Sequence, residues 1–144
     1  MGRWSYYSPL LIGALLVLSL ADQVRQQIAP AGGPLGWLAV WAAAVAFGVH
    51  CQVLMVGAQG AFAQVLPVPR GRSIRGSAAA AAGWLLIAWC VLAMATLLLG
   101  MEAVTPAAWT VGIAALAALL GAGLVYAWNI PAAVEDFGAE RPGR

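Results

Sequence analysis

Residues 35–66 read LGWLAVWAAAVAFGVHCQVLMVGAQGAFAQVL, and this stretch decides the fold. It is almost entirely apolar, and a helix of this length would extend roughly 48 Å at 1.5 Å per residue. About 20 apolar residues are enough to cross the hydrocarbon core of a bilayer. The stretch therefore predicts a transmembrane helix that either tilts strongly or projects from the membrane at one end.

The composition of the whole chain agrees with a membrane environment. Of its 144 residues, 63% are hydrophobic and 8% are charged, whereas a soluble domain carries about 25% charged residues. This number of charges is too small to cover a water-exposed surface. Membrane lipids are therefore expected partners. The net charge of +2 is small and spread along the chain, which argues against nucleic acid as a partner.

Three further apolar segments complete the predicted architecture. We expect the first to be an uncleaved helix rather than a signal peptide, because Trp4 and Tyr7 are unusual in the leading region of a signal peptide. The sequence thus predicts an all-α, polytopic integral membrane protein with a single domain of four transmembrane helices. The helices are expected at about 4–28, 35–66, 77–101 and 106–130, followed by a polar tail at 131–144.

The arginines predict the orientation of these helices. All seven basic residues are arginine, and a cytoplasmic N-terminus places every one except Arg25 on the cytoplasmic side. An excess of arginine in cytoplasmic segments is the usual determinant of membrane topology. We therefore expect both termini in the cytoplasm and the protein in a bacterial cytoplasmic (inner) membrane.

The polar residues of the 35–66 helix are expected on two faces. Gly57, Ala61 and Gln64 fall within about 40° of His50 at 100° per residue, while Gln52 and Gln59 lie on nearly the opposite side. Small residues let another backbone approach, and amide groups are costly to expose to lipid tails. Both faces are therefore predicted to contact protein, which would make this helix central.

His50 and Trp89 are the candidate cofactor-binding residues. His50, the only histidine, is expected near mid-membrane, where it either hydrogen-bonds a neighbouring helix or contacts a haem or quinone. A haem between two histidines would take the second one from another chain. Trp89 either packs against protein or touches a quinone or pigment ring. Cys51 and Cys90 are interpreted as packing residues, no metal site is predicted, and the cofactor stays unknown.

Two further sets of residues are predicted to contact partners or lipids. Arg70, Arg72 and Arg75 lie in the loop after residue 66, where they either touch lipid phosphates or form a docking surface. Ala114, Ala118 and Ala122 form a small-residue stripe with a spacing of four residues. Such a stripe is typical of close helix packing in membranes.

The missing motifs narrow the function further. The sequence has no H-E-x-x-H, G-x-S-x-G, C-x-x-C or glycine-rich nucleotide fingerprint, so we do not expect an enzyme. No charged residue is expected at mid-membrane, which argues against an ion-coupled transporter. The favoured hypothesis is a non-catalytic subunit of a respiratory, photosynthetic or transport complex. The alternatives are a haem- or quinone-contacting anchor that uses His50, and a small channel or transporter subunit that uses Gln52 and Gln59.

Overall fold

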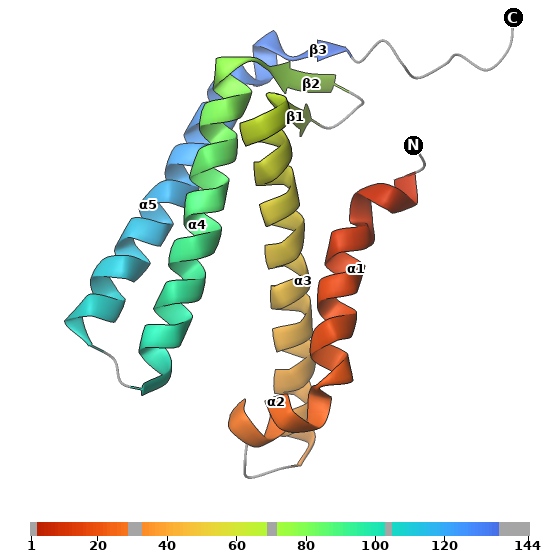
Figure 1. Cartoon of the computed structure of the whole chain (residues 1–144), viewed down its shortest axis with the longest axis vertical. Coiled ribbons are helices and arrows are strands. Elements are labelled where there is room, and N and C mark those ends of the chain that lie inside the picture. Colours follow the sequence, from red (N-terminus) through yellow and green to blue (C-terminus); the bar gives the residue numbers. More distant parts are fainter. Residues whose placement is uncertain (1–2, 29–32, 69–71, 103–104, 136–144) are drawn as a thin grey trace, which may run out of the picture. The chain divides into compact units, whose positions relative to one another are not determined.

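The computed structural model describes residues 3–28, 33–68, 72–102 and 105–135, which form long helices and one small sheet (Figure 1). The chain divides into two compact units, Met1–Met55 and Val56–Arg144, where the sequence predicts a single domain. The elements are α1 (Arg3–Ser19), α2 (Ala21–Ile28), α3 (Pro34–Ala63), β1 (Val65–Val68), β2 (Arg72–Arg75), α4 (Ser77–Glu102), α5 (Pro106–Asn129), the 3₁₀ helix η1 (Ile130–Ala132) and β3 (Val134–Glu135).

Three of the helices are long and apolar enough to cross a membrane. These segments are Pro34–Ala63, Ser77–Leu99 and Pro106–Ala132, and a shorter apolar helix covers Tyr7–Ser19. The predicted helical membrane architecture is confirmed for these three segments by their length and composition. The chain therefore has the helices of an integral membrane protein.

The helix expected at 4–28 is divided in two at Leu20. The Leu20 N–H donates to the Val17 carbonyl at 3.1 Å, three residues back, which tightens the last turn of α1. The Ser19 hydroxyl donates to the Leu16 carbonyl at 2.7 Å. The sequence also changes at this point from the apolar end of α1 to the polar α2, ADQVRQQI. The prediction of one continuous helix missed this break.

The helix expected at 35–66 begins one residue earlier and ends at Ala63, where the chain enters a β-hairpin. Gln64 has a φ of 53°, so it leaves the helix in the left-handed region. Strands β1 and β2 pair antiparallel, with Leu66 opposite Ile74, and β3 pairs with the other edge of β2. The all-α prediction therefore omits a three-stranded sheet, in which β1 and β2 form the α3–α4 connection and β3 follows α5 and η1.

The sheet covers a small core in the second unit. Gly76 has a φ of 78°, and its N–H donates to the Gln64 carbonyl at 3.0 Å, which closes the hairpin. Leu66 and Ile74 are then buried against Ala79, Ala82 and Ala133. The predicted polar tail thus begins with η1 and β3, and Ala133 between them belongs to this core, while residues 136–144 lie outside the described ranges.

Helices α4 and α5 pack side by side in the second unit (Figure 1). The Thr105 hydroxyl caps the start of α5 by accepting a hydrogen bond from the Ala108 N–H at 3.2 Å. The buried residues of α5 are Ala108, Ala115 and Ala122, which recur every seven residues. A seven-residue repeat keeps one face of a helix against an inclined neighbour. Small side chains at this face allow the two backbones to approach closely.

Candidate functional site

Arg72 fixes the C-terminal strand to the hairpin. Its Nη2 and Nε atoms donate to the carbonyl oxygen of Ala133 at 2.6 and 3.1 Å. Arg72 also pairs with Glu135 in the β2–β3 register. A guanidinium presents a planar fork of donors that is charged at all physiological pH values. We define the arginine cap as β1, β2 and β3 with their arginines, and Arg72 is its internal anchor.

The other arginines of the cap differ from Arg72. The Arg75 Nε donates to the Ser73 hydroxyl at 3.3 Å, and the Arg75 side chain is exposed while Ser73 is fully buried. Arg70 lies outside the described residues. The Tyr126 hydroxyl donates to the Pro67 carbonyl at 3.4 Å, which is long for such a bond. Of the described arginines in the cap, Arg75 therefore offers the exposed cation.

A cluster of glycines joins the end of α3 to α4 in the second unit. A Cβ atom added at Gly83 would lie 2.6 Å from the Gly57 carbonyl oxygen, and one added at Gly60 would lie 2.8 Å from the Ala79 carbonyl oxygen. Contacts this short mean that the two backbones touch without intervening side chains. Gly57 and Ala61, both predicted contact residues, are buried at this crossing.

A second close contact joins α1 to α3 in the first unit. A Cβ atom added at Gly48 would lie 2.6 Å from the Leu10 carbonyl oxygen. A Cβ atom added at Gly13 would lie 2.9 Å from the Cys51 sulfur. Cys51 is a free thiol that packs here as a small apolar side chain. The chain thus uses the same small-residue contact in both units.

The polar residues of α3 occupy different environments. His50 is half-buried and already interacts with other groups of the chain. Gln52 is half-buried, and its Oε1 atom is buried with no hydrogen-bond partner among the described residues. Gln59 is exposed, close to the C-terminal end of the helix. The roles predicted for these three residues remain predictions.

Trp89 and the cysteines lie within the apolar helices. Trp89 is half-buried and interacts with other groups of the chain, and the neighbouring Cys90 is buried with a free thiol. Among the described residues, no group of three or more His, Cys, Asp or Glu side chains is placed to hold a metal ion. The quinone or pigment contact predicted for Trp89 stays a prediction.

The alanine stripe predicted on α5 differs from the face that packs. Ala122 is buried at 3% exposure, Ala118 is half-buried and Ala114 is exposed. The face against α4 instead runs through Ala108, Ala115 and Ala122. Because the stripe turns away from α4 at Ala114, this end of it remains open to a neighbour outside the chain.

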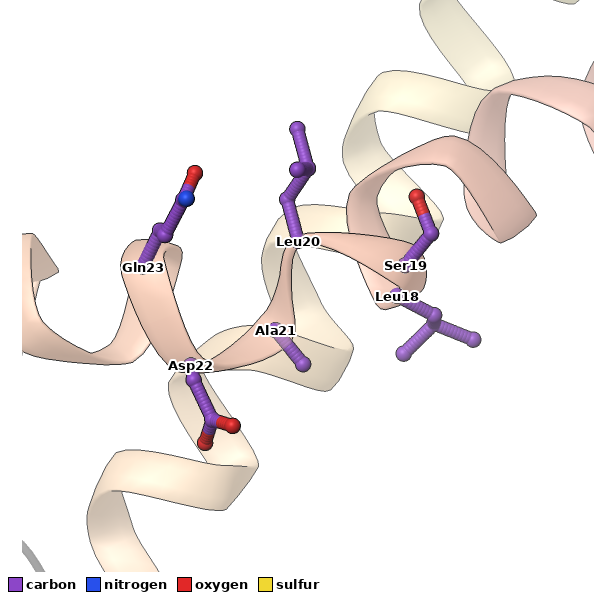
Figure 2. Close-up of a pocket in the computed structure, with 6 residues that line it drawn as sticks. All are labelled: Leu18, Ser19, Leu20, Ala21, Asp22 and Gln23. Atoms are coloured by element: carbon purple, nitrogen blue, oxygen red, sulfur yellow. The ribbon is translucent and has the colours of Figure 1, made fainter.

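The start of α3 and helix α2 form a polar corner in the first unit. The Arg25 guanidinium carbon lies 5.7 Å from the centroid of the Trp37 ring, and its Nη2 lies 4.0 Å from a carboxylate oxygen of Asp22. Residues 18–23, which include Asp22, line a hollow of about 310 Å³ at the α1–α2 break (Figure 2). We call Asp22, Arg25, Trp37 and this hollow the α2 corner.

The chain was compared with known protein families, curated proteins and solved structures. None of them matches. The function is therefore inferred from the geometry of the arginine cap, the helix contacts and the α2 corner. These surfaces present small residues, exposed apolar side chains and two exposed charged groups, which suit packing and lipid contact.

Sequence reasoning missed several residues that matter for these surfaces. The anchoring role of Arg72 depends on a residue 61 positions away, so no local pattern marks it. Gly60 and Gly83 were also missed, although Gly83 is the one glycine in an alanine-rich run that begins α4. A glycine at such a place signals close backbone approach. The contact between Arg25 and Trp37 joins two helices and has no sequence signature.

Proposed function

We propose that this chain is a non-catalytic integral membrane subunit of a larger respiratory, photosynthetic or transport complex in a bacterial cytoplasmic membrane. The observation that carries the proposal is how little of the helices the chain itself covers. In the most apolar 18-residue stretch of each long helix, 17%, 17% and 22% of the residues are buried. Most of the helical surface is therefore available to lipids and to other subunits.

The exposed surface carries large apolar side chains, which lipid alone can cover, and small or amide side chains, which gain more from contact with protein. On α5, large apolar side chains such as Ile113, Leu120 and Leu124 are exposed and fit the acyl chains of a bilayer. Ala114 and Gln59 are also exposed. A small side chain permits close helix contact, and an amide gains hydrogen bonds from protein that lipid tails cannot supply. These two positions are the proposed contacts with a partner subunit.

The orientation belongs to the same proposal. We place the arginine cap and both termini in the cytoplasm, with α1 as a fourth, shorter span. Arg3, Arg70, Arg72, Arg75, Arg141 and Arg144 then lie on the cytoplasmic side, and Arg25 lies outside. This distribution follows the positive-inside rule. The cap offers the exposed Arg75 to lipid phosphates or to a cytoplasmic partner.

The test is gentle purification of the tagged chain from its native membrane, with mass spectrometry and an absorption spectrum of the same sample. We expect a defined set of other membrane subunits in constant ratio to the chain. A homo-oligomer without other proteins would contradict the proposal and favour the channel hypothesis. A haem or pigment band that disappears in His50→Ala would instead favour the cofactor-contacting anchor.

A pair of matched variants tests the proposed contact on α5. Ala114→Leu adds bulk at an exposed small residue, and we expect the partner subunits to be lost while the isolated chain keeps its stability. Ala127→Leu adds the same bulk at another exposed alanine, about 140° around the helix from Ala114 at 100° per residue. It should keep the partners. Equal loss in both variants would show that Ala114 is not a specific contact.

A further inference from the structure

The α2 corner combines one cation and one anion that are close together but only weakly paired. Arg25 Nη2 and Asp22 Oδ1 are 4.0 Å apart, the limit for an ion pair, and their side chains are 32% and 79% exposed. The Arg25 Nε atom is buried without a hydrogen-bond partner among the described residues. Because the two groups pair only at the distance limit and both side chains are at least partly exposed, both charges retain capacity for an outside ligand.

The Arg25 side chain is held in place rather than free in solvent. Its guanidinium carbon lies 5.7 Å from the centroid of the Trp37 ring, within the range of a cation–π contact. A guanidinium fixed against a ring loses little freedom when its remaining donors bind an anion. Phosphate oxygens match the geometry of those donors well.

The surroundings of the corner are those of a membrane interface. Trp37 and Trp41 lie one turn apart on α3 and are 47% and 56% exposed, and tryptophans concentrate at the depth of lipid headgroups. The adjoining hollow is lined by apolar Leu18 and Leu20 as well as by polar Asp22 (Figure 2). An amphipathic hollow at this depth fits the junction between a headgroup and its acyl chains.

We propose that the α2 corner binds the headgroup of a phosphatidylethanolamine lipid. Arg25 binds the phosphate diester of this lipid. Asp22 binds its primary ammonium group, which a two-carbon bridge joins to the phosphate. Phosphatidylglycerol carries the phosphate without an ammonium, and phosphatidylcholine carries a bulky ammonium without N–H donors. The pair of opposite charges therefore favours phosphatidylethanolamine over both. This inference rests on the proposed membrane insertion and is independent of any partner subunit.

The test uses the whole chain in nanodiscs with equal amounts of the three lipids, and native mass spectrometry counts the lipids retained after ejection. We expect one phosphatidylethanolamine to be retained preferentially. Arg25→Gln should lower this retention about tenfold, equivalent to about 1.4 kcal/mol. Asp22→Asn should abolish the preference among the lipids while phosphate binding persists. Gln26→Ala, which shortens an exposed, uncharged side chain of α2 outside the hollow, is the control and should change nothing.

Three results would overturn the proposal. Equal retention of phosphatidylglycerol and phosphatidylethanolamine would reveal a simple cationic contact. If Arg25→Gln retains as much phosphatidylethanolamine as the wild type, the retained lipid is annular lipid that does not bind at the α2 corner. Displacement of the lipid by millimolar inorganic phosphate would identify a site for the free anion. If Arg25→Gln does not fold, Arg25→Lys keeps the charge and loses the planar fork, and it must also lower retention. Native subunit co-purification, measured separately, tests the proposed function.

Discussion

At the scale of single residues, one carbonyl oxygen holds the C-terminal strand in place. The Ala133 carbonyl accepts both hydrogen bonds from Arg72, and Ala133 is itself 7% exposed. Hydrogen bonds to a charged group contribute about 1.5–3 kcal/mol each to stability. The bond from Tyr126 to Pro67, at 3.4 Å, is too long to substitute for them. The Arg72 side chain therefore reinforces the backbone pairing that attaches β3 to β2.

We accordingly expect Arg72→Ala to release β3 from β2. Because both charge-assisted bonds share one carbonyl oxygen, their loss should lower the free energy of unfolding by the contribution of a single such bond, about 1.5–3 kcal/mol. Backbone amide exchange at β3 should become faster. The measurement is hydrogen exchange of the purified protein in detergent. Arg75→Gln is the control, because Arg75 is exposed and its Nε atom donates to Ser73 within its own strand. Equal protection of β3 in wild type and Arg72→Ala would contradict this role.

Gly83 gives a second prediction at this scale. A Cβ atom at Gly83 would collide with backbone atoms of Gly57, Gly60 and Ala61, and a backbone cannot turn aside as a side chain can. Gly83→Ala should therefore destabilise the protein by about 1–3 kcal/mol or more, measured by unfolding in mixed detergent micelles.

The matched control for Gly83→Ala is Gly123→Ala on α5. Among the described atoms, none lies within 4 Å of a Cβ added at Gly123. Alanine is favoured over glycine in a helix by about 1 kcal/mol, so this control should be neutral or stabilising. The same loss of stability in both variants would mean that helix propensity or detergent, rather than the crossing of α3 and α4, governs the result.

At the scale of elements, the contact between α1 and α3 is expected to show coupling. In Gly13→Ala the new methyl group would lie 2.9 Å from the Cys51 sulfur and 3.1 Å from the Gly48 Cα atom. Cys51→Ala removes the sulfur and leaves space for that methyl group. The double variant should be more stable than the sum of the single effects, by about 0.5–3 kcal/mol. Additive effects would show that the sulfur does not limit the approach of α1.

The long helices could be predicted because their signal is compositional. A run such as Pro34–Ala63 stays apolar for many turns, and length with apolar content is the main requirement for a membrane helix. The break at Leu20 gave no such signal, since neither glycine nor proline lies at it. It depends on local bonds to the carbonyls of Leu16 and Val17, which compete with the regular helical pattern.

The arginine cap could not be predicted for a different physical reason. Strands β1 and β2 have four residues each, and Pro67 lies within β1. Such short segments between prolines and glycines are typical of loops. Their stability comes from Leu66 and Ile74 packing on α4 and from β3, which is distant in sequence. The close packing at Gly57 and Ala61 has a local pattern, small residues at helical spacing, whereas the partner or lipid contact predicted for them stays a prediction.

At the scale of the whole molecule, the structure separates two kinds of contact. Contacts within each unit use glycine and alanine, as at Gly48 in the first unit and Gly83 in the second. The outward surface consists mainly of large apolar side chains, among them Leu38, Leu98 and Trp128. Without a hydrophobic force between helices in lipid, close packing decides which helices associate. Exposed small residues such as Ala114 are therefore the positions at which a further subunit would gain the closest packing.

The orientation of the chain gives the last prediction, because the proposed function places Ser77 in the cytoplasm and Ala107 outside. Both are exposed, at the first and second residues of α4 and α5 respectively. In a Cys51→Ala, Cys90→Ala background, a membrane-impermeant maleimide should label Ala107→Cys in intact spheroplasts and Ser77→Cys only after lysis. The reverse pattern would invert the orientation and move the arginines outside, against the positive-inside rule. Labelling of both from one side would show that α4 does not span the membrane.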